Sequence, residues 1–230
     1  MLRKWDDLPD FMKVDEVRLY WENLDKKRGQ LVLKRVFDVL VAFVLLILLF
    51  IPMLIIAIWI KLDSKGPVFY RQERVTAYGR HFHIHKFRTM VSNADKIGTA
   101  VTVGNDSRIT RVGSKLRRVR LDELPQVIDV LQGTMSFVGT RPEAVRYVEQ
   151  YKPEWMATML LPAGITSECS IRYKDEDKLL NAASDADKVY VEDILPGKMK
   201  WNLKSIKEFS IGAEIRTMIR TVLAVLGKEY

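Results

Sequence analysis

Cysteine is almost absent from the sequence, and this scarcity limits the kinds of protein that it can be. The one cysteine, Cys169, excludes a disulfide bond within the chain and suits a reducing compartment. We expect it to be a small buried side chain rather than a reactive thiol. The sequence also has no internal repeat. Charge is plentiful: the formal net charge of +8 predicts an anionic partner, which nucleic acid, an anionic membrane face or a phosphorylated substrate would each satisfy.

One long segment has no charge at all. Residues 39–60, VLVAFVLLILLFIPMLIIAIWI, contain neither acidic nor basic side chains over 22 positions. A helix rises about 1.5 Å per residue, so this run reaches roughly 33 Å, which is enough to cross the core of a bilayer. A cleavable signal peptide does not fit, because about thirty mostly polar residues precede the run and no small-residue cleavage pattern follows it. The run therefore predicts a membrane helix.

The path of this helix through the membrane is a separate question. Pro52 lies inside the run and lacks a backbone donor, so we expect the helix to kink or break there. Asp38 at the edge of the run needs a cationic partner, for which Lys34 and Arg35 are the candidates. Basic residues flank the run on both sides: Lys26, Lys27, Arg28, Lys34 and Arg35 before it, and Lys61, Lys65, Arg71 and Arg74 after it. Because positive flanks tend to stay in the cytoplasm, this pattern favours a re-entrant helix over a straight span.

The whole pattern predicts a membrane-associated α+β protein in three parts. Residues 1–30 form a polar extension, residues 31–62 the membrane helix, and residues 63–230 a small globular cytoplasmic domain. At the end of that domain, residues 211–226 predict an amphipathic helix that lies on the membrane or docks on the domain. The extension has an apolar helix face that could also rest on the membrane: Phe11, Val14, Val17, Leu19 and Trp21.

The cytoplasmic domain is predicted to begin with a short β-hairpin. The segments PVFYRQ and HFHIHKF are two strands joined near Tyr78–Gly79, and residues 92–107 form an exposed loop. A helix follows Arg120 and ends at Gly133, because apolar residues recur at helical spacing between them: Leu124, Val127, Ile128 and Leu131. Residues 142–160 are expected to be helical. Residues 168–200 are expected to be irregular, apart from one helical patch at 177–187.

Three histidines alternate along the second predicted strand. His81, His83 and His85 would all face one side of that strand, where they could bind a transition metal. An exposed strand face is the simpler interpretation, and we favour it.

An acidic pair surrounded by arginines carries the candidate chemistry. Asp122 and Glu123 lie among three basic clusters. The first contains Lys86 and Arg88, and the third, after the acids, contains Arg141. The second runs directly up to the acids: Arg108, Arg111, Lys115, Arg117, Arg118 and Arg120. Arginine has forked donors that match phosphate oxygens. Adjacent carboxylates suit a divalent metal and a nucleophile, the combination that phosphoryl transfer requires. The alternative is structural, because acids stabilise helix starts and arginines nearby can simply pair with them.

The order of motifs resembles one family, the monotopic phosphoglycosyl transferases, which are bacterial sugar transferases. The resemblance covers roughly residues 33–167. It is carried by these stretches: KRVFDVLVAF, Pro52, KLDSKGPVFYRQER, FHIHKFRTM, SRITRVGSKLRRVRLDELPQVIDVLQGTMSFVGTRP and PAGIT. LDELPQ followed by MSFVGTRP, downstream of KFRTM and a membrane helix, is highly specific.

The resemblance implies a reaction and a set of roles. The aspartate of LDELPQ, here Asp122, would attack the β-phosphate of a UDP-sugar and release UMP. Polyprenyl phosphate would then take the sugar-1-phosphate from the enzyme. Glu123, with Asp122, would bind Mg²⁺. The family implies a re-entrant helix broken at Pro52, in the bacterial inner membrane with the domain on the cytoplasmic face. Four residues would contact or support the phosphates: Arg117, Arg141, Lys86 and Arg88.

The sequence also departs from the family pattern. Thr140 stands where the family usually has proline in G-P-R-P, and the segment after Gly164-Ile165-Thr166 also differs. The identity of the donor sugar therefore cannot be inferred from the family. We expect an N-acetylhexosamine donor, because this sequence resembles the short form of the family, which lacks an added N-terminal region with several membrane spans. We expect membrane lipid as a partner and no nucleic acid, since no nucleic-acid-binding module accompanies the charge. A homodimer is left open.

Two other classes of protein remain as alternatives. A catalytically silent membrane scaffold has no need for LDELPQ, and a basic adaptor that binds anionic lipid leaves the order of the motifs unexplained.

Overall fold

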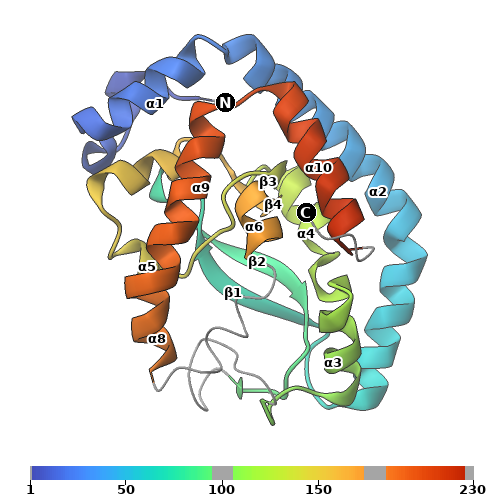
Figure 1. The fold of residues 1–230 in the computed structure, drawn as a ribbon. Helices are drawn as coiled ribbons and strands as arrows, with labels where there is room; N and C mark the ends of the chain where they lie inside the picture. Colours follow the sequence, from blue (N-terminus) through green and yellow to red (C-terminus); the bar gives the residue numbers. More distant parts are fainter. Residues whose placement is uncertain (1, 95–105, 174–184, 226–230) are drawn as a thin grey trace.

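A computed structural model describes residues 2–94, 106–173 and 185–225. Its fold is α+β, with a long curved helix along one side of a globular body (Figure 1). The helices are α1 (Asp15–Asp25), α2 (Arg28–Asp63), α3 (Arg111–Arg118), α4 (Gln126–Gln132), α5 (Val145–Val148), α6 (Glu168–Arg172), α8 (Ala186–Val189), α9 (Leu195–Lys207) and α10 (Ile211–Val225). The strands are β1 (Phe69–Val75), β2 (His81–Phe87), β3 (Met135–Val138) and β4 (Ala163–Thr166).

Two small sheets form the centre of the body. The predicted hairpin is confirmed, since β1 and β2 pair antiparallel with Val75 opposite His81. Tyr78 and Gly79 make its turn with φ angles of 62° and 70°, a conformation in which glycine carries no steric penalty. Strands β3 and β4 are parallel. Just beyond β3, Gly139 approaches Gly164 so closely that a Cβ on either would overlap the backbone of the other.

Helix α2 packs against the globular body on both sides of Pro52. Ala42 belongs to a buried cluster with residues of α4 and β3, whereas Ile56 and Ile60 belong to another cluster with Leu116 of α3. The helix runs through Pro52 without ending, over 36 residues or about 54 Å. A break in the helix at Pro52, as we predicted, is therefore absent from the described secondary structure. Figure 1 shows a curved helix instead.

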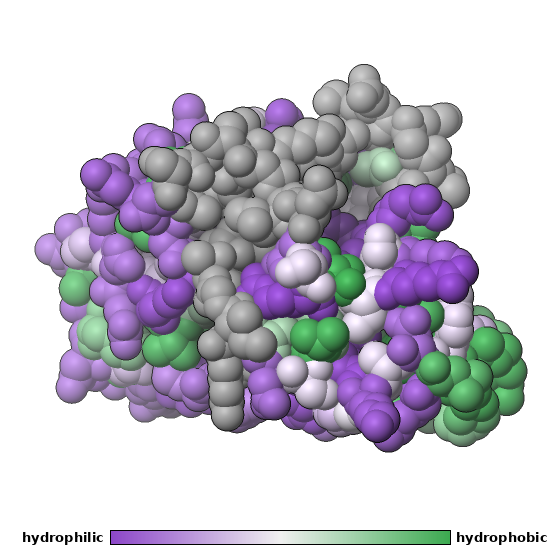
Figure 2. All heavy atoms as spheres, turned by 90° about the horizontal axis from the view of Figure 1, so that it is seen from below, coloured by the Kyte–Doolittle hydropathy of each residue, from purple (hydrophilic) through white to green (hydrophobic). Residues whose placement is uncertain are grey.

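The opposite face of α2 is apolar and largely exposed, and Lys115 of α3 lies over its Trp59 ring. It carries large hydrophobic side chains that are 38% to 66% exposed over most of the membrane run: Phe37, Leu40, Phe43, Val44, Ile47, Leu48, Phe50, Ile51, Leu54, Ile55, Ile58 and Trp59. Figure 2, seen from below, shows hydrophobic surface gathered at the edge of the molecule where α2 lies. A free hydrophobic surface of this length marks contact with lipid or with another apolar partner. By length and composition, α2 is long and apolar enough to cross a membrane.

Polar side chains near the start of α2 fasten it to the body. Asp38 lies 4.0 Å from Lys34, which confirms the predicted pair, and it accepts a hydrogen bond of 2.7 Å from the Ser136 hydroxyl. Lys34 also pairs with Glu214 of α10. Arg35 donates to the carbonyls of Val130 and Leu131 at 2.7 and 3.0 Å, at the end of α4. These buried and part-buried groups hold α2, α4, β3 and α10 in one arrangement.

Residues 1–30 do not stand apart from the body as an extension. Met12, Val17 and Leu24 are fully buried in the largest core cluster, together with Leu195 and Met199 of α9. Helix α1 therefore packs on α9 and on the turn Pro153–Met159. The predicted apolar face is only partly right, because Leu19 is 72% exposed.

The second half of the chain is more helical than we predicted. Residues 168–200 are not irregular where the structure describes them: they form α6, α8, a π-helical turn at Tyr190–Ile194 and the first part of α9. The predicted patch at 177–187 lies mostly outside the described residues, as does most of the loop 92–107. Residues 142–160 form only α5 and a 3₁₀ turn, interrupted before Pro153. The predicted C-terminal helix is confirmed as α10, with Ile215, Ile219 and Val222 exposed.

Thr76 links three segments of the body through one hydroxyl. It is 2% exposed, donates to the Thr134 carbonyl at 2.6 Å and accepts from the Ala163 amide at 3.1 Å. We predict that Thr76→Val lowers the free energy of unfolding by about 2–3 kcal/mol, because two buried backbone groups lose their partner. Thr76→Ser keeps the hydroxyl and should cost less than about 1 kcal/mol. Denaturant unfolding in detergent measures both, and a valine variant as stable as the serine variant would contradict the role.

Candidate active site

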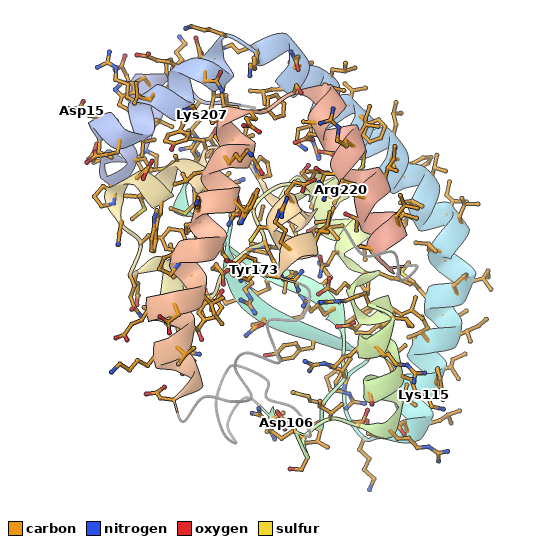
Figure 3. The ribbon with its side chains drawn as sticks, viewed as in Figure 1. Asp15, Asp106, Lys115, Tyr173, Lys207 and Arg220 are labelled. Carbon is orange, nitrogen blue, oxygen red and sulfur yellow. The ribbon has the colours of Figure 1, made fainter. Side chains whose placement is uncertain are left out.

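A large cavity lies between the hairpin, α3, α6 and α9. Its volume is about 1040 Å³, and its lining includes Asp122, Glu123, Lys86, Arg141 and Arg117. Six of the predicted site residues thus line one space: Lys86, Arg88, Arg117, Asp122, Glu123 and Arg141. Figure 3 shows side chains from the hairpin and from the surrounding helices directed toward this region, with Tyr173 near the middle of the molecule.

The acidic pair occupies a separate turn rather than the start of α4. Leu121–Glu123 forms a single 3₁₀ turn, and α4 begins only at Gln126. Arg120, just before the turn, has φ 58°, which is uncommon for a residue with a side chain and recurs at functional sites. Leu121 and Leu124 pack against the cluster that contains Ile56 and Ile60. Apolar residues on either side of the acids therefore fix this turn to the second half of α2.

Glu123 is held by two cations. Its Oε1 accepts from Lys86 Nζ at 3.0 Å and from Arg141 Nη2 at 2.5 Å, and its Oε2 lies 3.4 Å from Arg141 Nη1. Burial alone would raise the pKa of Glu123, but Arg141 and Lys86 outweigh burial and hold this pKa well below its usual range. Burial lowers the pKa of Lys86, against the attraction of Glu123. Glu123 is thus a carboxylate fixed in charge and direction.

Asp122 is buried beside this ion pair without a comparable partner. It is 9% exposed, and its Oδ1 has no hydrogen-bond partner among the described residues. Burial raises the pKa of Asp122, and the repulsion of Glu123 adds to this, while Lys86, Arg117 and Arg120 oppose it. A desolvated carboxylate that is not consumed by an ion pair is a better nucleophile than a paired one. The two neighbouring acids are therefore electrostatically different.

The other two predicted phosphate-binding residues lie in different surroundings. Arg117, from the last turn of α3, lines the cavity and lowers the pKa of Asp122 through its charge. Arg88 borders the cavity but directs its guanidinium to the carbonyls of Ser64, at 2.8 Å, and Lys65. It therefore fastens the chain that leaves α2, and the structure gives it no contact with the acidic pair.

The alternating histidines do not act together. His85 Nδ1 lies 2.7 Å from Asp129 Oδ1, and its backbone amide donates to Asp129 Oδ2 at 2.9 Å. His81 pairs instead with Glu73 at 3.0 Å. Within the described parts of the chain, no group of three or more His, Cys, Asp or Glu side chains could hold a metal. The His85–Asp129 contact joins β2 to α4, so it fixes Lys86 beside the acidic turn.

Sequence reasoning missed a second buried polar group in the cavity. Glu143, two residues after Arg141, contacts Lys198 of α9 and Tyr190 of the π-helical turn. Nearby, Arg74 of β1 lies 3.4 Å from the Pro142 carbonyl. Of these residues, only Glu143 could have been identified from the sequence as a candidate site residue, since it follows the GTRP motif. Nothing local marks Lys198 or Tyr190, which lie in a stretch that we expected to be irregular.

The residues present fit a magnesium ion that is shared with a substrate. Mg²⁺ is typically bound by one or two carboxylates, and phosphate oxygens and water complete its shell. Asp122 and Glu123 supply two adjacent carboxylates, and the unpartnered Oδ1 of Asp122 leaves a ligand position available.

Comparison with known proteins identifies the family. The chain belongs to the bacterial sugar transferases, whose family model matches residues 29–228. It is 36% identical over 198 residues to a UDP-N-acetylgalactosamine-undecaprenyl-phosphate N-acetylgalactosaminephosphotransferase of Aeromonas hydrophila. It is 37% identical over 195 residues to a UDP-glucose:undecaprenyl-phosphate glucose-1-phosphate transferase of Escherichia coli (strain K12). These matches cover 84% and 83% of this chain, which spans 44% and 39% of the two relatives. The resemblance seen in the sequence is thereby confirmed.

The unequal environments of the two acids predict opposite effects on stability. Ionised Asp122 opposes folding, because its folded-state pKa is raised, so Asp122→Asn should stabilise the protein at pH 7 by about 1 kcal/mol. Glu123→Gln should destabilise it by about 2 kcal/mol, because Lys86 and Arg141 lose a buried counter-charge. Denaturant unfolding checks both signs.

The pH dependence of the first variant provides the control. As pH falls through the raised pKa of Asp122, the wild-type carboxyl becomes neutral and the advantage of Asp122→Asn should disappear. The account would be contradicted if both variants changed the free energy of unfolding in the same direction. It would also be contradicted if the stability difference between Asp122→Asn and the wild type did not depend on pH.

Proposed function

We propose that this chain transfers a sugar-1-phosphate from a UDP-sugar to polyprenyl phosphate at the bacterial inner membrane, as a phosphoglycosyl transferase. The observation that carries the proposal is the buried, unpartnered carboxylate of Asp122 beside Glu123, which two cations hold in place. The relatives' names support the donor and acceptor classes. In the assembly of a bacterial surface glycan, this step would place the first sugar on the lipid carrier.

The proposed reaction has two displacements at one phosphorus atom. An oxygen of Asp122 attacks the β-phosphorus of the donor, the bond between that phosphorus and the α–β bridging oxygen breaks, and UMP leaves. An oxygen of polyprenyl phosphate then attacks the same phosphorus, which frees the Asp122 carboxylate and forms polyprenyl-diphosphate-sugar. The first transfer stores the phosphosugar on the protein, so donor and acceptor need not be bound together.

The other residues of the site would stabilise charge and fix geometry. Arg141 and Lys86 keep Glu123 ionised, and Arg117 adds positive charge beside Asp122, where the transferred phosphate would carry its negative oxygens. Bound Mg²⁺ would neutralise the diphosphate and ease the departure of UMP. Arg88 would act indirectly, by holding the segment between α2 and β1.

We also propose that α2 enters and leaves the membrane by the cytoplasmic face. Its Asp38 and Ile60 contact the same globular body, although they lie on opposite sides of Pro52. A straight span would carry one of these ends to the far side of the bilayer, away from the body. The curved course of α2 and its free apolar face support partial insertion. Leu45 and Leu49 of α2 border the cavity, where an acceptor anchored in the bilayer could reach Asp122.

The reaction can be tested with purified protein in lipid nanodiscs. With Mg²⁺, undecaprenyl phosphate and a panel of UDP-sugars, we predict UMP release with at least one donor. Asp122→Asn should lower the rate by at least about 10⁴-fold, because the attacking oxygen is lost. Removal of Mg²⁺ with a chelator should abolish turnover, and its return should restore it. Absence of UMP release with every donor would refute the enzyme, and an active Asp122→Asn protein would refute the nucleophile.

The orientation of α2 has its own test. Single cysteines at Leu19, which is 72% exposed, and at the exposed Arg80 lie before and after α2, and Cys169→Ala removes the natural thiol. In intact cells a membrane-impermeant maleimide should label neither position, and in inverted vesicles it should label both. Labelling of one position in intact cells and of the other only in inverted vesicles would mean a true span.

A further inference from the structure

The cavity is larger than the phosphates around Asp122 require. It measures about 1040 Å³ and continues from the acidic turn to a second wall, formed by α6, the turn at Tyr190 and α9. Residues that line this wall include Ser170, Tyr190, Lys198 and Asn202. Most of its residues come from the part of the chain after Thr166, and Glu143 joins them from the segment that follows Arg141.

The second wall is polar, and the charges of Glu143 and Lys198 cancel within it, while Arg74 at its edge adds to the lowering of the Glu143 pKa. Lys198 Nζ lies 3.1 Å from Glu143 Oε1 and donates to Tyr190 Oη at 2.8 Å, and Tyr190 Oη donates to the same Glu143 oxygen at 2.7 Å. All three side chains are at most 7% exposed. The phosphate end, in contrast, has an excess of cations. A compact neutral cluster of donors and acceptors suits hydroxyl and amide groups rather than phosphate.

Asn202 adds an independent indication that this wall meets a ligand. It lies one helical turn after Lys198 on α9 and is 3% exposed. Its Nδ2 lies 3.9 Å from the sulfur of Met199, and its Oδ1 has no hydrogen-bond partner among the described residues. A buried acceptor without a partner is costly, and an O–H or N–H of a ligand would satisfy it. Asn202 also borders a smaller cavity of about 250 Å³ between α9 and α10.

The chain itself sets the distance between the two ends. Arg141 holds Glu123, and Glu143, only two residues later, holds Lys198 and Tyr190. Two residues span at most about 7 Å between Cα atoms. The backbone positions of Arg141 and Glu143 are therefore close, and the segment Arg141–Glu143 links the acidic pair to the second wall.

We propose that Asn202 and the Glu143–Lys198–Tyr190 cluster bind the sugar of the donor, and that Asn202 helps to select which sugar is accepted. This inference rests on the proposed function, since it assigns the part of a nucleotide sugar that lies beyond the β-phosphate. Asn202 contacts a hydroxyl or acetamido group through its amide, and the cluster supplies a fixed hydroxyl from Tyr190. The phosphate end binds every donor alike, and the second wall distinguishes between them.

The test compares binding of UDP with binding of UDP-sugars, using full-length protein in nanodiscs and calorimetry. In the wild type, UDP-N-acetylgalactosamine or UDP-glucose should bind more tightly than UDP. Asn202→Ala should weaken the preferred UDP-sugar about tenfold, through the loss of one hydrogen bond, and leave the affinity for UDP within about twofold. Tyr190→Phe removes one hydroxyl and keeps the ring, so it should give the same pattern if Asn202→Ala does not fold.

Asn23→Ala is the matched control, because Asn23 donates to the Lys207 carbonyl at the other end of α9 and lies outside the cavity. It should change neither affinity. Equal weakening of UDP and UDP-sugar, no weakening of either, or a wild type that binds no sugar donor better than UDP would overturn the assignment. A wild type that binds UDP-sugars without releasing UMP would refute the proposed function alone, because the binding comparison does not depend on turnover.

Discussion

The packing of α2 along the globular body is the constraint on which the rest of the structure depends. A helix that is apolar over 22 positions would ordinarily leave the protein for the bilayer, yet one of its faces is held at both ends. Lys34, Arg35 and Asp38 supply polar contacts near its start, and Ile56 and Ile60 supply apolar contacts near its end. The acidic turn packs on the second of these contacts through Leu121 and Leu124. The position of the carboxylates is therefore set by the same helix that carries the exposed apolar face.

Two adjacent acids at the candidate site are electrostatically unlike each other. In Asp122 and Glu123 the side chains point into different surroundings: the second meets Lys86 and Arg141, and the first meets a buried space. Their pKa values move in opposite directions for this reason. Glu123 stays ionised and is fixed in direction by Lys86 and Arg141. Asp122 keeps a carboxylate oxygen that no hydrogen bond among the described residues satisfies, at some expense in stability.

Local patterns in the sequence predicted the parts of the fold that depend on neighbouring residues. The alternation around Tyr78–Gly79 fixed the hairpin, and apolar spacing closed by Gly133 located α4. The motifs also brought Lys86, Arg117 and Arg141 to the acidic pair. Long-range packing could not be predicted in this way. Residues 1–30 look polar, but Met12, Val17 and Leu24 are buried because α9 covers them.

Contacts within the candidate active site also depend on long-range packing that the sequence alone could not predict. Arg88 belongs to a basic motif, yet the carbonyls of Ser64 and Lys65 lie closer to it than the carboxylates do. Lys198 and Asn202 belong to a lysine-rich stretch whose helical character depends on burial of Met199 and Leu203. The direction of each pKa shift required knowledge of which cations flank which oxygen. Sequence thus singled out the acidic pair, and three-dimensional packing showed how the surroundings of its two members differ.

The central claim is that Asp122 carries the phosphosugar between donor and acceptor. Mass spectrometry tests it most directly, on protein incubated with Mg²⁺ and its UDP-sugar donor in the absence of polyprenyl phosphate and then quenched. We expect one sugar-phosphate on the peptide containing LDELPQ, located at Asp122 and removed when polyprenyl phosphate is added. Turnover with no adduct on any residue, or an adduct on a residue other than Asp122, would contradict the account.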